Sequence, residues 1–224
     1  MTTLEEWPHR WVPGASGAAS PTLLLLHGTG GDESDLIPLG EELAPGASLL
    51  SPRGPVSELG MPRFFRRHAE GVFDEADIRA RVPALAAFIG AAATTYEFAP
   101  GSVFALGFSN GANMAASLLL LVPGLLRGAV LLRAVMPLEP ATQPNLAGTS
   151  VLISAGKVDP FSPVERTQRL ADVLRAAGAD VSLRWQRTGH QLVPGDLEDT
   201  RAWLSQHLPH IGAQDSAPGP RSRG

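Results

Sequence analysis

The sequence predicts an α/β fold with a mostly parallel sheet of about seven or eight strands and helices on both faces. Short apolar runs that suit buried strands alternate along the 224-residue chain with segments of helical spacing. The run from Thr22 to Leu26 ends in four consecutive leucines, which favours a strand covered on both faces. Residues 102–118 read as a buried strand, a tight turn and a helix in immediate succession. In such sheets, functional loops lie at the carboxyl ends of the strands.

Strands and helices alternate in the first half of the chain, and prolines interrupt them. We predict an edge strand at 7–12, a buried strand at 22–26, a glycine-rich loop at 27–33, a helix at about 34–43 and a short strand at 47–50. Residues 51–73 are predicted to be the least regular part of the chain, because three prolines are expected to break any helix or strand there. A loop of this length inside a compact domain is usually functional or partly folded. A helix follows from its N-cap Asp74 to about Tyr96, and Pro83 is expected to kink or split it.

The second half repeats the alternation and ends in a segment of different composition. We predict a strand before Ser109, a helix after it to about 121, strands at 128–135, 149–154 and 180–186, and helices at 163–177 and 195–208. Residues 1–208 are therefore expected to form a single domain. Residues 209–224 are rich in Gly, Pro, Ser, Gln and Arg, which predicts a disordered tail.

Composition and charge exclude several classes of partner. The net charge is −4 and the pI is about 5.8, so no basic surface for nucleic acid is expected. The apolar runs are too short to span a bilayer. The N-terminus lacks a basic segment followed by an apolar one, which predicts a cytoplasmic protein without stable membrane insertion. The sequence leaves open whether the chain is a monomer or a homodimer.

No cofactor or metal is expected. The chain has no cysteine, which excludes disulfides, thiolate metal ligands and a thiol nucleophile. The histidines are scattered and form no His-x-x-x-His pair with acidic neighbours. The loop 27–33 lacks the Gly-Lys-Ser/Thr ending of a phosphate-binding loop and the spacing of a dinucleotide fingerprint.

Ser109 is the candidate nucleophile. It lies at the apex of the predicted strand-to-helix turn, where the residues two before and two after it crowd each other and need to be nearly free of side chain. Gly107 and Gly111 meet this requirement. Gly-Phe-Ser-Asn-Gly alone is a weak signal in a chain with 24 glycines, but the flanking strand and helix make it a strong one.

His190 and Asp159 are the candidate base and acid. A serine hydroxyl needs a base to remove its proton, and a histidine does this best when a carboxylate fixes its tautomer. His190 follows the last predicted strand and Asp159 the strand before it, so the chain order is nucleophile, acid and base. Asp172, Asp180 and Asp196 are rival acids, of which Asp172 fits an exposed helix face and Asp196 a helix N-terminus.

Two backbone N–H groups are expected to bind the oxyanion that develops during acyl transfer. The N–H of Asn110 begins the helix after Ser109, and the helix dipole adds to its effect. The second donor is expected in the loop 27–33, where glycines let the backbone turn inward. Thr29 is our assignment and Gly30 the alternative.

These motifs resemble those of the α/β-hydrolase superfamily over residues 7–208. The loop His27-Gly28-Thr29-Gly30-Gly31-Asp32-Glu33 and the turn Gly107-Phe108-Ser109-Asn110-Gly111 are similar to those of its carboxylesterase/phospholipase group, which includes bacterial carboxylesterases and acyl-protein thioesterases. The resemblance implies an α/β-hydrolase fold without a large cap domain. It also implies a serine esterase of short- to medium-chain esters, with Ser109, Asp159 and His190 as its triad. Segment 62–74 is similar to one in bacterial members linked to hydroquinone or aromatic-compound stress.

The sequence defines the substrate pocket less well than the triad. Phe64 and Phe65 either pack in the core or form a pocket wall, and we assign them to substrate binding because ligand pockets have apolar walls. The neighbouring arginines are expected to be solvated or paired, with an anionic substrate group as the alternative.

Three functions are compatible with such a site. The first is hydrolysis of a small-molecule carboxylic ester through an acyl-enzyme. Lysophospholipase or thioesterase activity would use the same triad on a different leaving group. The third is a non-catalytic protein of the same fold that binds a ligand.

Overall fold

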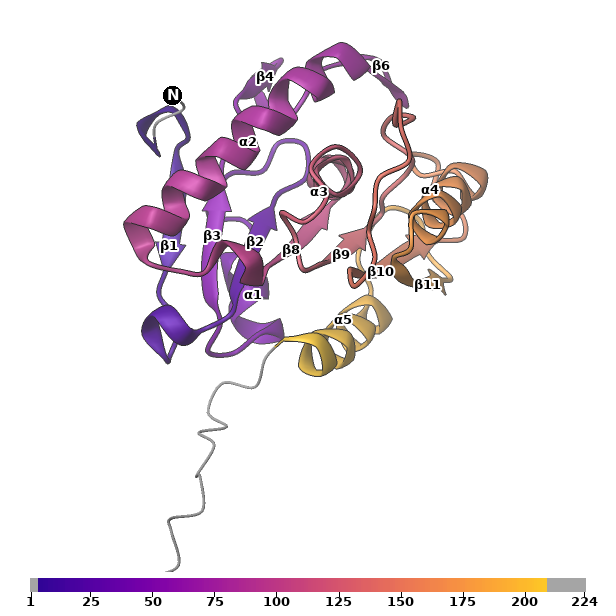
Figure 1. Cartoon of the computed structure of the whole chain (residues 1–224). Helices are drawn as coiled ribbons and strands as arrows, with labels where there is room; N and C mark the ends of the chain where they lie inside the picture. Colours follow the sequence, from indigo (N-terminus) through magenta and orange to yellow (C-terminus); the bar gives the residue numbers. More distant parts are fainter. Residues whose placement is uncertain (1–3, 209–224) are drawn as a thin grey trace, which may run out of the picture.

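The computed structural model describes residues 4–208 and confirms the predicted sheet (Figure 1). Its strands are β1 His9–Val12, β2 Thr22–Leu26, β3 Ser48–Pro52, β8 Val103–Phe108, β9 Gly128–Leu132, β10 Ser150–Gly156 and β11 Asp180–Gln186. The seven strands lie in the order β1-β3-β2-β8-β9-β10-β11. Only β1, at one edge, pairs antiparallel with its neighbour within the described part of this sheet.

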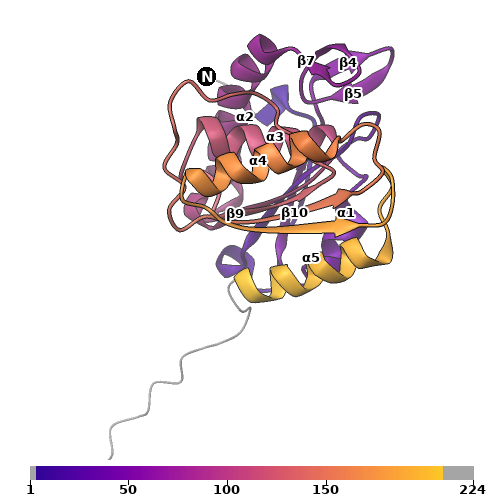
Figure 2. The same ribbon diagram turned by 90° about the vertical axis from the view of Figure 1, so that its right-hand side faces the viewer.

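Helices cover both faces of the sheet. They are α1 Ile37–Leu43, α2 Glu75–Tyr96, α3 Asn110–Leu121, α4 Val164–Ala176 and α5 Pro194–His207, with short 3-10 turns at Leu4–Glu6, Gly17–Ala19 and Pro100–Ser102. Figure 2 shows α2, α3 and α4 on one side of the sheet and α1 and α5 on the other. No large cap domain covers the sheet in residues 4–208.

Two hydrophobic clusters form the core, one on each face of the sheet. Leu24 and Leu26 of β2 pack into the cluster that includes side chains of α2, α3 and α4. Leu23 and Leu25 pack into the cluster that includes α1 and α5. Alternate residues of a strand point to opposite faces, so the leucine run contributes to both clusters, as a strand covered on both faces requires.

Segment 51–73 is partly folded, which is one of the two alternatives expected for a loop of this length. It forms two small antiparallel hairpins, β4 Val56–Glu58 with β5 Met61–Arg63 and β6 Arg67–Ala69 with β7 Val72–Phe73. Pro62 lies within β5 opposite Ser57. A two-stranded ribbon leaves one edge of each strand unpaired, so a residue without an N–H group is tolerated there. The expectation that the prolines break every element of this segment was wrong, because a proline is excluded from the interior of a sheet but not from its edge.

Helix α2 runs through Pro83 without a break, so the split that was one alternative of the prediction does not occur. A proline in a helix interior costs about 3 kcal/mol. The side chains of Ile78, Val82, Leu85 and Phe88 are fully buried against the core, and this packing outweighs the local cost. Asp74 caps the helix as predicted, since its Oδ1 accepts the N–H of Asp77 at 3.0 Å.

Two further predictions concern the chain end and the membrane. The predicted tail at 209–224 lies outside the residues that the structure describes. Between residues 4 and 208, no helix combines the length and the apolar character needed to cross a bilayer.

Candidate active site

The turn at Ser109 joins β8 to α3 and is strained. Ser109 has φ 52° and ψ −112°, which L residues rarely adopt. A Cβ atom on Gly111 would lie 2.0 Å from the carbonyl oxygen of Leu26, and one on Gly107 would lie 2.7 Å from the backbone of Ala112. The two glycines thus permit the close approach of helix and strands that the sequence pattern indicates.

A continuous chain of hydrogen bonds joins Ser109, His190 and Asp159. Nε2 of His190 lies 2.8 Å from Oγ of Ser109, and Nδ1 lies 2.7 Å from Oδ2 of Asp159. The other carboxylate oxygen of Asp159 accepts hydrogen bonds from the N–H groups of Phe161 (2.9 Å) and Ser162 (3.2 Å). Because the buried carboxylate accepts the Nδ1 proton, Nε2 is left to accept the proton of the serine.

The sheet topology explains why these side chains meet. Ser109 follows β8, Asp159 follows β10 and His190 follows β11, and all three strands run parallel in one sheet. Their carboxyl ends therefore open at the same edge. The rival acids Asp172 and Asp180 are exposed at other positions, so the structure pairs His190 with Asp159.

Arg133 is a buried residue of the site that sequence reasoning missed. It follows β9 with φ 61°, and its side chain is fully buried. Its guanidinium donates to the carbonyls of Gly189 (3.2 Å) and Gln191 (2.7 Å), the residues on either side of His190. Its own carbonyl accepts the hydroxyl of Ser162 (3.0 Å), in the loop of Asp159. Arg133 thereby connects the loop of the base to the loop of the acid.

Asp196 is the counter-ion of Arg133. Its two carboxylate oxygens accept hydrogen bonds from Arg133 at 2.8 and 2.6 Å, and Ser154 donates to it at 2.6 Å. Burial alone would raise the pKa of Asp196, but the hydrogen bonds from Arg133 and Ser154 outweigh burial and hold the pKa below its ordinary value. Asp196 also lies in the first turn of α5, as the sequence predicts, and accepts the N–H of Val193 (2.8 Å).

The two predicted oxyanion donors lie beside Ser109 on the cavity wall. Among the hydrogen bonds of residues 4–208, the N–H groups of Thr29 and Asn110 have no acceptor. The alternative donor, Gly30, has its N–H bonded to the carbonyl of Pro62 at 3.0 Å. The geometry therefore favours Thr29 over Gly30.

Hydrogen bonds of the His27 side chain stabilise the loop that contains Thr29. Nε2 of His27 accepts the N–H of Gly54 (2.9 Å), so its proton is on Nδ1, which lies 2.6 Å from the carbonyl oxygen of Gly28. Burial lowers the pKa of His27 below its ordinary value of 6.5, against opposing contributions from Gly28 and nearby carboxylates. A second proton would also remove the acceptor of the Gly54 N–H.

Because the pKa of His27 is lower in the folded chain, the free energy of unfolding is predicted to decrease as the pH is lowered below about 6.5. The unfolded chain binds the proton at a higher pH than the folded chain does. The contribution of neutral His27 to stability is therefore complete above the pKa of the unfolded state and is lost as the pH falls toward the pKa of the folded state. Urea unfolding of the wild type and of His27→Asn at about pH 7.5 and about pH 5.5 measures this. The wild type should lose more stability between the two pH values than the variant. Equal losses would contradict the prediction.

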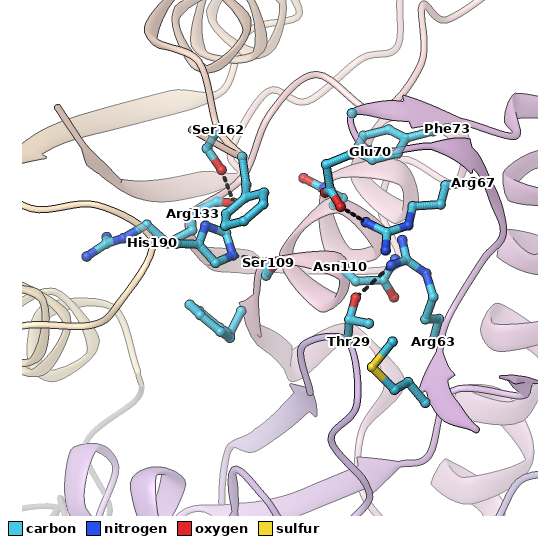
Figure 3. A pocket seen from close by; sticks show the side chains of 15 residues that line it. Thr29, Arg63, Arg67, Glu70, Phe73, Ser109, Asn110, Arg133, Ser162 and His190 are labelled. Carbon is cyan, nitrogen blue, oxygen red and sulfur yellow. Dashed lines mark hydrogen bonds and ion pairs between the residues drawn. The ribbon is translucent and has the colours of Figure 1, made fainter. Parts of the chain in front are cut away.

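A cavity of about 300 Å³ opens beside Ser109. Figure 3 shows His190 on one side of it and Arg63, Arg67 and Glu70 on the other. Its apolar lining comes from Met61, Phe73, Phe108 and Phe161. The volume lies at the small end of the range for small-molecule sites.

Phe64 and Phe65 do not line this cavity, contrary to the prediction from sequence. Both side chains are fully buried in the core cluster on the α2 and α3 face. The ring of Phe64 packs on His27, with 4.7 Å between centroids, and the ring of Phe65 packs on Phe73 at 5.3 Å. The burial of apolar area draws these adjacent aromatic side chains inward, and Phe73 faces the cavity instead.

Within residues 4–208, no three His, Cys, Asp or Glu side chains lie close enough together to hold a metal ion. The arrangement can instead support acyl transfer. It brings together a serine hydroxyl, an imidazole whose Nδ1 is hydrogen-bonded to a carboxylate, and two N–H groups without acceptors in the described part of the chain, which are the groups that acyl transfer needs.

Comparisons with known proteins agree with this chemistry. A family model described as phospholipase/carboxylesterase matches residues 9–208. MhqD of Bacillus subtilis (strain 168), which bears the name of a hydrolase, is 47% identical over 192 residues, or 86% of this chain and 96% of MhqD. The Bacillus cereus carboxylesterase is 45% identical, with a TM-score of 0.87 over 90% of this chain and 94% of that one. A Mesorhizobium loti carboxylesterase is 36% identical, with a TM-score of 0.82 over 89% and 95% of the two chains.

Proposed function

This chain belongs to the phospholipase/carboxylesterase family, and we propose that its reaction is the hydrolysis of short- to medium-chain carboxylic esters through an acyl-enzyme on Ser109. That it is an esterase-type hydrolase follows from the family and from the carboxylesterases it is similar to. The observation that best supports the finer proposal is the chain of hydrogen bonds from Asp159 through His190 to Ser109. Ser109 and His190 both line the cavity.

The proposed reaction has two halves. Oγ of Ser109 attacks the ester carbonyl carbon while Nε2 of His190 takes the hydroxyl proton, and the N–H groups of Thr29 and Asn110 bind the oxyanion. Collapse of this intermediate breaks the bond to the alcohol, which leaves with the proton from His190. Water then attacks the acyl-enzyme in the same way, releases the carboxylic acid and restores Ser109.

The size of the cavity sets an expected limit on acyl-chain length. Each methylene that is buried adds about 0.8 kcal/mol of binding, or close to fourfold in kcat/KM. A cavity of about 300 Å³ holds a chain of limited length, so this gain is expected to end at a medium length.

A series of nitrophenyl esters of increasing chain length tests the proposal. We expect kcat/KM to rise through the short esters and to level off or fall at long ones, with an initial burst of nitrophenol as the acyl-enzyme accumulates. A maximum at long chains, or a strong preference for matched thioesters, would favour the lysophospholipase or thioesterase alternative. Absence of turnover on every member of the series would favour a ligand-binding role.

A further inference from the structure

We infer that the preferred substrates carry a carboxylate in their acyl group, and that the side chains of Arg63, Arg67 and Asn110 bind it. This substrate class rests on the esterase activity proposed above. These residues form the cavity wall that faces His190 in Figure 3. Each has a side-chain donor that no other described residue uses.

Arg63 is a charged side chain held rigidly in this wall. It lies in β5, and only 3% of its side chain is exposed. Nη1 donates to Oγ1 of Thr29 at 2.8 Å, and Nε donates to the carbonyl of Phe65 at 3.2 Å. Nη2 donates no hydrogen bond to any residue between 4 and 208, yet it is not among the fully buried unpaired atoms. Arg63 lines the cavity, and Nη2 is the guanidinium nitrogen that is left to bind a ligand there.

Arg67 brings a second guanidinium to the same wall. Its Nε donates to Glu58 at 3.0 Å and its Nη1 to Glu70, which leaves Nη2 without an acceptor in the described chain. Glu58 also forms an ion pair with Arg63, at 3.2 Å. Burial and, after it, the like charge of Arg67 lower the pKa of Arg63, although Glu58 and Glu70 oppose this shift. An anion between the two guanidinium groups would relieve this repulsion.

Asn110 adds a neutral donor. Its Oδ1 accepts the N–H of Phe64 at 2.7 Å, and this bond fixes the orientation of the amide. Nδ2 is then buried and has no hydrogen-bond partner among the residues that the structure describes. A buried donor without an acceptor costs about 1–3 kcal/mol, which a ligand oxygen would recover.

The chemistry of this wall selects the ligand group. Two guanidinium Nη2 groups and one amide Nδ2 group offer donors, and a carboxylate offers two acceptor oxygens that match a guanidinium in geometry and charge. A neutral alkyl chain would leave all three donors without acceptors.

The position of the wall places the carboxylate in the acyl half of the ester. The leaving alcohol has to lie within reach of Nε2 of His190, which gives it a proton. The acyl group then extends away from His190, toward Arg63 and Arg67 on the opposite side. Monoesters of short dicarboxylic acids fit this arrangement.

The test compares monoethyl glutarate with ethyl 5-methylhexanoate, which replaces the carboxylate by an isopropyl group of similar shape. Acid release is followed by titration at constant pH, and the ratio of the two kcat/KM values is the readout. We expect the wild type to favour the glutarate monoester by about tenfold or more, the size of one charge-assisted hydrogen bond. The ratio should fall as salt is added.

Variants of the ion pair between Arg67 and Glu70 test whether Arg67 itself binds the carboxylate. Arg67→Gln should lower the ratio by about tenfold, because it removes a donor and a positive charge. Glu70→Gln should raise the ratio, because it removes the carboxylate that competes for Arg67. Arg169→Gln, at an exposed ion pair with Glu139, is the control and should leave the ratio unchanged.

The outcomes separate this substrate class from the esterase activity. Hydrolysis of the neutral ester with no preference for the glutarate monoester overturns the inference and leaves the esterase proposal standing. Shifts of the ratio in the same direction in Arg67→Gln and Glu70→Gln also overturn it, since they would indicate a purely structural role for the pair. If neither ester nor any nitrophenyl ester is hydrolysed, the esterase proposal fails and the substrate class fails with it.

Discussion

Replacing Ser109 with Ala is expected to lower kcat for a short nitrophenyl ester by about 10⁴- to 10⁶-fold. The variant removes Oγ, the atom of residue 109 that is hydrogen-bonded to Nε2 of His190, so no acyl-enzyme can form. Binding and the oxyanion donors remain, and KM should change little. Steady-state kinetics on the purified variant, with circular dichroism to verify folding, measures the effect.

A second serine of the same cavity provides the matched control. Ser162 also lines the pocket, but its hydroxyl donates to the carbonyl of Arg133 and not to His190. Ser162→Ala should therefore lower kcat by about tenfold or less, which corresponds to the loss of one neutral hydrogen bond. Equal losses in the two variants, or full activity in Ser109→Ala, would show that Ser109 is not the nucleophile.

Replacing Arg133 with Met is expected to destabilise the protein by about 3–5 kcal/mol, because it leaves Asp196 buried without its counter-ion. It also removes the hydrogen bonds from Arg133 to the carbonyls of Gly189 and Gln191. These bonds fix the backbone on both sides of His190. A displacement of the base by about 1 Å can cost about 10²-fold in rate. We therefore expect kcat to fall about 10²-fold in the folded fraction while KM changes little. Urea unfolding and kinetics at low temperature measure the two effects.

A double-mutant cycle isolates the contribution of this ion pair. Asp196→Asn should also be strongly destabilising, but Arg133→Met with Asp196→Asn should lose less than the sum of the two single variants, by about 1 kcal/mol or more. Arg201→Met, at an exposed ion pair with Glu42, should change stability by about 0.5 kcal/mol or less. If the losses in the free energy of unfolding at Arg133 and Asp196 are additive, the ion pair between them does not stabilise the fold as proposed.

Local patterns were sufficient to predict the sheet and the chemistry-bearing loops. The strands at Thr22–Leu26 and Asp180–Gln186 have the predicted bounds, because apolar runs and flanking turn residues are properties of the chain itself. The order of Ser109, Asp159 and His190 along parallel strands implied that they end at one sheet edge. The structure joins them by hydrogen bonds.

Features that depend on tertiary contacts could not be predicted in the same way. Arg133 directly follows an ordinary apolar strand, and nothing near it in the sequence relates it to Asp196 or to the loop of His190. Phe64 and Phe65 were assigned to the pocket from composition, whereas the hairpins of segment 51–73 turn both into the core and present Arg63 and Phe73 to the cavity. The path of such a segment depends on the surface on which it packs.

Intact-mass measurement after treatment with a fluorophosphonate tests the central claim most directly, because this reagent phosphonylates an activated serine. The wild type should gain the mass of a single adduct, and peptide mapping should place it on Ser109. Ser109→Ala should gain no mass under the same conditions. An unlabelled wild type, or an adduct on another serine such as Ser162, would contradict the assignment of Ser109 as the nucleophile activated by His190.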